Sequence, residues 1–404
     1  MRAAETENDY PSPLRIGLFW LGIQAVWGAL LGISLQARTI ELAAGSNALV
    51  AYGRLATAGA VVAAIVQVAV GPWSDARRAH GSRRIEFYAA GAVAGAVAVV
   101  GFYGASSFAA LSLSFLVLQA ALNCAIGPYQ AIIPDVMPRA RFGVASSWMA
   151  ALQSAGNAVG ALLAAFVSNA AALGGTLAAL LVGTCAVTGA QLRRQTILPP
   201  PPRARIAITR TFVDLFVSRA LVYVGFYTLL GYLLFYVSGV LGAHAVAAAK
   251  QQSGALILAF TVFGAVGAAA AARPSDRMDK RLVATIGGVV VTAALAMFVA
   301  THALPWSIAA TLIAGAGWGV FLVADWAIAC RILPAGALAT TMGVWNLALI
   351  LPQIIAPALT TAVLAHFGIA SGPQGPRVAF GLAIGETLVG IAWLWRLSRS
   401  AIGE

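Results

Sequence analysis

Charged residues are scarce in this chain of 404 residues: Lys, Arg, Asp and Glu make up 9% of it, whereas 60% is hydrophobic. Soluble domains carry about a quarter charged residues, so this balance excludes an ordinary water-soluble protein. Cysteine is rare too, because the chain holds only Cys124, Cys185 and Cys330, far apart and without a His or Cys at metal-ligand spacing. Neither a disulfide framework nor a metal site is expected. No nucleophile-base or His-carboxylate pair stands out, so we expect no enzyme and no cofactor.

Long apolar runs take the place of these features. Twelve runs reach about 20 residues, the length that crosses a hydrocarbon core of roughly 30 Å as a helix. They lie at approximately 16–38, 48–72, 85–105, 107–136, 142–168, 172–192, 212–238, 250–272, 282–302, 305–332, 338–365 and 378–397. Strand-like alternation is absent, so helices must satisfy the backbone hydrogen bonds in lipid. The predicted fold is an all-α membrane protein with twelve transmembrane helices.

A charged segment recurs half a chain length later. GPWSDARRAHGSRR, which starts at Gly71, contains Ser74-Asp75, and RPSDRMDKR contains Ser275-Asp276. An internal repeat of this kind indicates two homologous membrane bundles in tandem. Between them, RRQTILPPPPRARIAITR has four successive prolines and cannot continue a helix. We therefore predict two pseudo-symmetric six-helix bundles at 1–192 and 212–404, joined by a cytoplasmic Pro- and Arg-rich linker at 193–211.

Basic residues concentrate in the even-numbered loops and the C-terminal tail, whereas the odd-numbered loops hold only Arg38, Lys250 and Arg377. Because cytoplasmic loops are enriched in Lys and Arg, both termini are expected in the cytoplasm. The net charge of +12 therefore reflects topology and does not predict nucleic-acid binding. The first run is longer than a signal-peptide core, so no cleaved signal is expected. We expect a multi-pass, monomeric protein of the cytoplasmic (inner) membrane, embedded in the lipid bilayer.

The first charged segment follows a Gly-x-x-Ser-Asp pattern with Gly-x-Arg-Arg. It resembles the loop between the second and third helices of the major facilitator superfamily, and the matching residues are Gly71, Ser74, Asp75, Gly81, Arg83 and Arg84. The resemblance implies a cytoplasmic gate in which Asp75 faces a helix N-terminus, where the helix dipole favours a carboxylate. The implied gating residues are Asp75, Arg83, Arg84 and, in the second half, Asp276. A positive-inside loop without a further role would explain the arginines but not an Asp in both halves.

Segments in other apolar runs resemble one particular group of transporters. GPYQAIIPDVMPRARFGVASSWMAALQSAGNAVG (from Gly127), MGVWNLALILPQ (from Met342) and GIQAVWGALLGISLQ (from Gly22) are similar to sucrose-proton symporters and their bacterial relatives. The cation symporters of the glycoside-pentoside-hexuronide family are near neighbours. This likeness implies alternating access and proton-coupled symport of a small polar solute, a carbohydrate or glycoside, with sodium as the alternative coupling ion. The charged loop departs from the sucrose group, because Ser82 to Phe87 reads SRRIEF where that group has arginines followed by Pro-Phe.

Two other functions fit the same sequence. One is export of an amphipathic compound, although the fifth run lacks the Gly-Pro and paired glycines of the drug-proton antiporters. The other is a non-transporting membrane protein of the same fold, such as a pigment-related or assembly factor. The fifth run instead carries Gly156 and Gly160 as a G-x-x-x-G motif, which predicts close packing against a neighbouring helix.

Polar and aromatic side chains at helical spacing mark candidate contacts to a solute. Amides and aromatic rings in a cavity suit a hydrogen-bonding solute, but in the first, fourth and fifth runs interhelical bonds and packing are equally good explanations. The predicted substrate-binding residues are Gln24, Trp27, Gln119, Asn123, Tyr223, Tyr227 and Asn346. Tyr232 and Tyr236, nearer the outer end of the seventh run, are expected to be interfacial anchors.

Charged groups inside a membrane are candidates for function by default. Arg219, Asp325 and Glu386 are the predicted proton-coupling residues. Arg219 and Asp325 each lie about eight residues from the cytoplasmic end of their runs, so we expect them to face one another. A static ion pair that fixes helix packing is the alternative. Glu386 is expected to be a neutral acid or a partner for another helix, and Asp135 to have a structural role at the interface at least as readily as a proton site.

Overall fold

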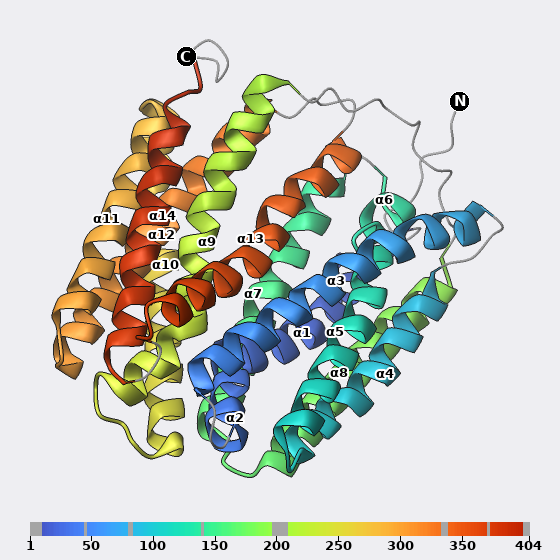
Figure 1. Ribbon diagram of the computed structural model, residues 1–404. Helices are drawn as coiled ribbons and strands as arrows, with labels where there is room; N and C mark the ends of the chain where they lie inside the picture. Colours follow the sequence, from blue (N-terminus) through green and yellow to red (C-terminus); the bar gives the residue numbers. More distant parts are fainter. Residues whose placement is uncertain are drawn as a thin grey trace. The chain divides into compact units, whose positions relative to one another are not determined.

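The computed structural model describes residues 10–43, 47–79, 84–138, 141–195, 209–332, 338–369 and 372–398. These residues are almost entirely helical and include no strand (Figure 1). Twelve helices among them are long and apolar enough to cross a membrane. The prediction of an all-α fold with twelve membrane spans is therefore confirmed.

The chain forms two compact units, one of residues 1–30 and 58–202 and the other of residues 31–57 and 203–404. Helix α3 (Ala48–Ala79) begins in the second unit and ends in the first. The first unit contains α1 (Pro13–Ala29), α4 (Ile85–Gly104), α5 (Phe108–Tyr129), α6 (Ile132–Val136), α7 (Phe142–Phe166) and α8 (Ala170–Arg193). The second contains α2 (Leu35–Leu42), α9 (Arg210–Gly239), α10 (Val246–Arg277), α11 (Lys280–Ala300), α12 (Leu304–Ile332), α13 (Leu338–His366) and α14 (Gln374–Leu394). The bundle boundaries predicted from the repeat stay a prediction, and most of the predicted linker lies outside the described residues.

In the first unit, α1 packs against α7 and α8, and α4 packs against α5 and α8. Two glycines bring α7 onto the backbone of α1. A Cβ placed on Gly160 would overlap the carbonyl oxygen of Ala25, and one placed on Gly156 would overlap that of Leu21. The close packing predicted for this G-x-x-x-G motif is therefore confirmed.

In the second unit, α9 packs against α13 and α14, and α12 packs against α10 and α11. Glycines again allow the closest approach, because a Cβ on Gly319 of α12 would overlap the carbonyl oxygen of Gly264 of α10. The short helix α2 rests on α9 and α10. Helix α9 thus contacts α2, α10, α12, α13 and α14, and it carries Arg219, Tyr223 and Tyr227 of the predicted site.

Two predicted runs are not single α-helices. The first continues from α1 through a π-helix at Leu30–Ser34 into α2. The fourth, predicted at 107–136, is divided into α5 and α6 by a turn at Gln130 and Ala131. Pro134 has no N–H to donate to the carbonyl of Gln130, so the regular helical bond across this turn cannot form.

Candidate functional site

An ion pair joins the middle of the second unit. Arg219 of α9 donates a hydrogen bond to Asp325 of α12, and their side chains are 1% and 3% exposed. The guanidinium carbon lies 5.0 Å from the ring centre of Tyr223 and 5.5 Å from that of Trp326. A carboxylate and two aromatic faces thus stabilise a cation withdrawn from water. The predicted contact between Arg219 and Asp325 is confirmed, whereas a role in proton coupling stays a prediction.

Aromatic side chains extend this site along α9 and α12. Tyr223 packs edge-on against Trp318 with ring centres 5.0 Å apart, and Trp318 stacks on Phe226 at 4.4 Å. The ring of Tyr227 lies one turn further along α9, 6.3 Å from that of Tyr223. The structure therefore brings two predicted substrate-binding tyrosines next to the ion pair, because residues four apart share a helix face.

Gln353 of α13 joins the same site, although it was not among the predicted substrate-binding residues. Its amide Nε2 donates to the hydroxyl of Tyr227 at 3.0 Å and to the backbone carbonyl of Leu349 at 3.4 Å. The side chain of Asn346, which was predicted on the same helix, lies outside the described residues. A hydroxyl and an amide thus stand beside the buried charges.

Glu386 lies on α14 and faces α9. The hydroxyl of Thr228 donates to its Oε2 at 3.2 Å, while Oε1 is buried and has no hydrogen-bond partner. Within the described part of the chain it forms no ion pair. The expectation of a partner on another helix is confirmed through Thr228, and proton coupling by Glu386 stays a prediction.

A small apolar pocket in the second unit lies beside Phe226 and Trp318. Its lining residues are Val222, Gly225, Phe226, Leu229, Phe260, Val291, Leu295, Trp318 and Thr387. Thr387 supplies its one side-chain hydroxyl, so the pocket offers little to a polar solute. Arg219, Tyr227 and Gln353 offer more polar groups to such a solute.

The predicted amides of the fourth run form a hydrogen-bonded cluster in the first unit. Gln67 of α3 donates through Nε2 to Oδ1 of Asn123 at 2.6 Å. Asn123 in turn donates through Nδ2 to the backbone carbonyl of Gln119 at 2.8 Å and to its Oε1 at 3.2 Å. These bonds join α3 to α5, so the cluster serves interhelical packing in this structure. Contact between Gln119 or Asn123 and a solute stays a prediction, and Gln67 was missed.

The predicted residues of the first run make fewer polar contacts. Gln24 and Trp27 of α1 are half-buried and have no described hydrogen bond. Gln24 lies against α7, where a Cβ on Gly156 would be 3.0 Å from its Cβ. Trp20, one turn before Gln24, is buried with its ring centre 5.3 Å from that of Tyr129. No described contact joins these side chains to the amide cluster of α5.

The charged loop of the first unit is organised by Arg84. Its Nη1 donates to Oγ of Ser74 at 2.7 Å, its Nη2 lies 2.8 Å from Oδ1 of Asp75, and its Nε lies 2.9 Å from Oδ2 of Asp135. Arg84 precedes α4 with a left-handed backbone (φ 60°). Asp75 therefore contacts the residue that immediately precedes the next helix. Arg83 lies outside the described residues, and gating by Asp75 and Arg84 stays a prediction.

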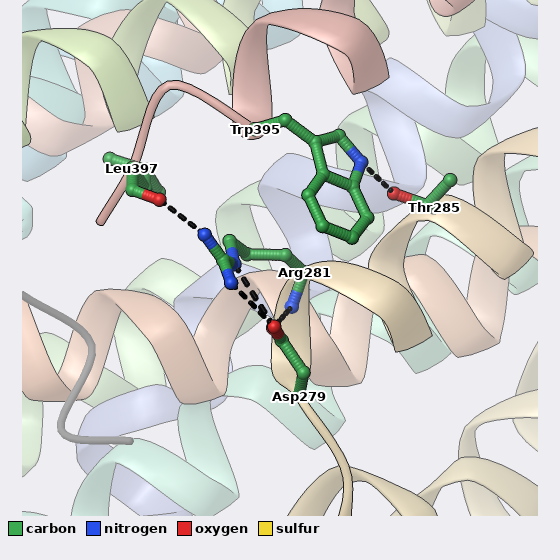
Figure 2. A network of polar contacts seen from close by, with 5 residues as sticks. All are labelled: Asp279, Arg281, Thr285, Trp395 and Leu397. Atoms are coloured by element: carbon green, nitrogen blue, oxygen red, sulfur yellow. Dashed lines mark hydrogen bonds and ion pairs between the residues drawn. The ribbon is translucent and has the colours of Figure 1, made fainter. Parts of the chain in front are cut away.

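The corresponding region of the second unit is held by Arg281, which the sequence did not single out. Its guanidinium pairs with Asp279 at 2.6 Å, and its Nη1 donates to the backbone carbonyl of Leu397 at 2.5 Å. Figure 2 shows the indole of Trp395 beside it, donating to the hydroxyl of Thr285 at 2.9 Å. These contacts tie the start of α11 to the end of α14. The side chain of Asp276, predicted for gating, lies outside the described residues.

One intramembrane carboxylate was overlooked in the sequence. Asp214 stands near the start of α9 and is buried. It accepts a hydrogen bond from Nε1 of Trp393 at 3.1 Å and lies 3.6 Å from Nε of Arg396. The signal for it was available, since Asp214 falls within the seventh apolar run. Its partners tie α9 to the end of α14.

Tyr232 and Tyr236 are not interfacial anchors, so that expectation is wrong. Both are buried, at 1% and 0% exposure, and their hydroxyls lie 3.2 Å from those of Thr361 and Ser307 respectively. A buried hydroxyl needs such a partner, which a residue at the lipid interface would find in water. The expectation failed because the position of a residue near a helix end does not reveal which neighbouring side chains cover that residue.

Comparison with known proteins identifies the architecture. The family model for the Major Facilitator Superfamily matches residues 16–357. A bacterial homologue of the human lysosomal transporter Spinster, inward-facing and occupied, is 16% identical with a TM-score of 0.76 and 96% coverage of both chains. An auto-inhibited peptide transporter of the POT family is 12% identical, with a TM-score of 0.75 and coverage of 96% of this chain and 97% of that one. A D-xylose-proton symporter is 15% identical, with a TM-score of 0.67 and coverage of 97% and 98%. At these identities the likeness establishes the fold alone, and the curated proteins contain no significant match.

Proposed function

Because the chain belongs to the Major Facilitator Superfamily, we propose that it is a secondary active transporter that couples the movement of a small polar solute to protons. It would work by alternating access in the cytoplasmic membrane, with both termini in the cytoplasm and the single chain as the transporting unit. The observation that carries the proposal is the buried pair of Arg219 and Asp325. Ionisable groups inside a membrane are costly and usually mark an ion or proton pathway.

The two members of the pair differ in their capacity to carry a proton. Asp325 can gain and lose one, whereas the guanidinium of Arg219 stays charged under all physiological conditions. Protonation of Asp325 would therefore neutralise a carboxylate that is paired with a buried cation. Such a change biases the arrangement of α9 and α12, which is what coupling of a proton to a conformational step requires.

The surrounding side chains favour a polar, hydrogen-bonding solute. The hydroxyl of Tyr227 and the amide of Gln353 stand near the pair, and the rings of Tyr223 and Trp318 supply apolar surface. Sites that combine polar groups with apolar surface bind small molecules that have both a polar and an apolar part. A carbohydrate or glycoside is our first expectation for the solute, on the resemblance carried by Gly127–Gly160 and Met342–Gln353.

The test is uptake into proteoliposomes by wild type and by Asp325→Asn. The solute would first be selected by a thermal-shift screen of sugars, nucleosides, amino acids and drugs, because a ligand of the folded state raises the melting temperature. We expect Asp325→Asn to abolish accumulation driven by a pH gradient while retaining exchange of solute at equal concentrations. Asp214→Asn is the matched control, since Asp214 is a buried carboxylate of the same unit that accepts a hydrogen bond near the start of α9. This variant should still accumulate solute. Wild-type accumulation by Asp325→Asn would reject the assignment.

A further inference from the structure

We propose that the surface formed by Arg277, Trp395 and Arg396, where α10 and α14 end and α11 begins, binds the headgroup of an anionic phospholipid. The lipid phosphate binds the guanidinium groups of Arg277 and Arg396, and the acyl chains lie along the exposed face of α11. This lipid site belongs to the second unit, and it does not depend on which solute the protein carries.

Two helices place this surface at the boundary of the hydrocarbon layer. The apolar span of α14 ends at Leu394, and Trp395 and Arg396 follow directly. The apolar span of α11 begins at Lys280. Tryptophan is enriched at the membrane interface, and an arginine beside it extends its guanidinium towards the polar headgroups. The sequence of the two helix ends therefore puts positive charge at the depth of the lipid phosphates.

Arg281 holds the end of α14 against the start of α11 and thereby positions Arg396. The guanidinium carbon of Arg281 lies 5.0 Å from the ring centre of Trp395, and its Nη1 donates to the backbone carbonyl of Leu397 at 2.5 Å (Figure 2). Arg396 lies between these two residues in the chain. Its own guanidinium carbon is 4.4 Å from the ring centre of Trp393, and its side chain is 47% exposed. A phosphate thus meets a guanidinium that is both accessible and positioned by its neighbours.

Positive charge exceeds negative charge around this surface. The segment from Arg273 to Arg281 carries four cations and two carboxylates, and Arg396 with Asp214 adds one of each. Nε of Arg396 lies 3.6 Å from Oδ1 of Asp214, which leaves its two Nη groups for another anion. Arg277, the last residue of α10, is exposed and makes no contact that the structure describes. These charges favour a lipid with a net negative charge over a zwitterionic lipid, whose ammonium group the arginines repel.

An apolar face of α11 continues from this surface along the membrane span. Leu282, Ile286 and Val289 share one side of the helix and are 39%, 45% and 49% exposed. Nε1 of Trp395 donates to the hydroxyl of Thr285 at 2.9 Å, so the indole lies beside this face (Figure 2). A soluble phosphate gains nothing from such a face, whereas acyl chains bury apolar area against it. The combination of exposed guanidinium groups and an adjoining apolar face therefore fits a phospholipid.

The experiment compares two lipids that differ only in their headgroup. Purified protein in detergent is heated with dioctanoyl phosphatidylglycerol and, separately, with dioctanoyl phosphatidylcholine at equal concentrations. Phosphatidylglycerol should raise the melting temperature by about 2–4 °C more than phosphatidylcholine does, because a ligand that binds only the folded state stabilises it. The variant R277Q/R396Q should lose this difference. The matched control R193Q/R194Q, which removes two exposed arginines at the end of α8 in the first unit, should keep it.

Equal melting temperatures of the wild type in the two lipids overturn the proposal, as does a difference that R277Q/R396Q keeps or that R193Q/R194Q loses. If R277Q/R396Q yields no folded protein, Arg277→Gln alone is measured, since Arg277 makes no described contact that the substitution could disturb. It should lower the rise specific to phosphatidylglycerol by at least about half, and an unchanged rise overturns the proposal. Glycerol 3-phosphate should produce no rise. A rise as large as that with phosphatidylglycerol would assign the surface to a soluble anion and overturn the lipid site.

Discussion

Arg84 binds two carboxylates that differ greatly in exposure. The side chain of Asp135 is 13% exposed, whereas that of Asp75 is 71% exposed, and the guanidinium that joins them is 6% exposed. A charge pair in water contributes little because solvent screens it, but loss of a shielded partner leaves a buried charge uncompensated. The residue flagged by the family motif, Asp75, is therefore the weaker contributor to stability.

We predict that Asp135→Asn lowers the free energy of unfolding by about 1–3 kcal/mol and Asp75→Asn by less than about 1 kcal/mol. The two substitutions are matched in chemistry and share the same arginine, so each is a control for the other. Thermal unfolding in detergent measures the difference. If the two variants lose equal stability, or Asp75→Asn loses more, then the exposure of the carboxylates does not determine how much each contact with Arg84 stabilises the protein.

At the scale of residues, contacts between charged side chains could be predicted from the sequence more readily than contacts that involve uncharged polar side chains. Arg219 and Asp325 could be paired in advance because charges are rare in apolar runs and these two lie at similar depth. Gln67, Thr228 and Gln353 were not predicted, because none of them has an amide four residues away on the same helix, as Gln119 and Asn123 do. Asp214 could have been found, because it is a carboxylate inside a predicted run.

At the scale of helices, small residues decide which elements touch. Gly160 of α7 lies directly against the backbone of α1, while Gly183 of α8 has no heavy atom within 4 Å of where a Cβ would stand. A side chain at Gly160 must push α7 away from α1, because neither backbone can yield without losing helical hydrogen bonds. The sequence distinguishes the two glycines through the G-x-x-x-G motif, which includes Gly160 and not Gly183.

We predict that Gly160→Leu lowers the stability of the protein by about 1–3 kcal/mol, the usual effect of overpacking a close helix contact. Gly183→Leu, with the same added volume on an open surface, should change it by no more than about 0.5 kcal/mol. Thermal unfolding and the yield of monodisperse protein measure both. A destabilised Gly183→Leu with an unaffected Gly160→Leu would contradict the helix packing described for the first unit.

Hydropathy located the spans closely but not the breaks within them. The apolar runs coincide with all twelve described spans because transfer into lipid depends on composition over about 20 residues. Transfer into lipid does not depend on the register of the helical hydrogen bonds, so the hydropathy does not reveal the π-helix at Leu30–Ser34. The turn at Gln130 was partly foreseeable, since Pro134 removes one helical bond.

At the scale of the molecule, the internal repeat predicts which residues are homologous but not which residues pack together. Residues 31–57 belong to the first half in sequence and cluster with the second unit in space. Tyr52 packs on Tyr232 and Phe235, with ring centres 5.6 and 5.4 Å apart, and Nε2 of Gln36 donates to the carbonyl of Gly231 at 3.3 Å. Packing of this kind depends on the conformational state, which no periodicity of the sequence encodes.

These contacts should be broken during transport if the protein works by alternating access, because one side of the solute site must open as the other closes. A disulfide that involves position 53 would keep these contacts in place. A Cβ on Gly53 would lie 2.9 Å from the Cβ of Thr361, and a small adjustment brings this to the roughly 3.5–4.5 Å of a disulfide. Both residues belong to the second unit, so a bond between them would fix the segment 31–57 in the position described here.

We predict that Gly53→Cys combined with Thr361→Cys, with Cys124, Cys185 and Cys330 replaced by Ala, stops transport on oxidation and recovers it on reduction. Thr361→Cys alone in the same background is the control, and oxidation should leave its rate unchanged. Mass spectrometry measures the fraction of cross-linked chains, and solute flux in proteoliposomes should fall in proportion to it. Flux that persists in fully cross-linked protein would mean that residues 31–57 stay on the second unit throughout the cycle, so that the opening movement must occur elsewhere in the molecule.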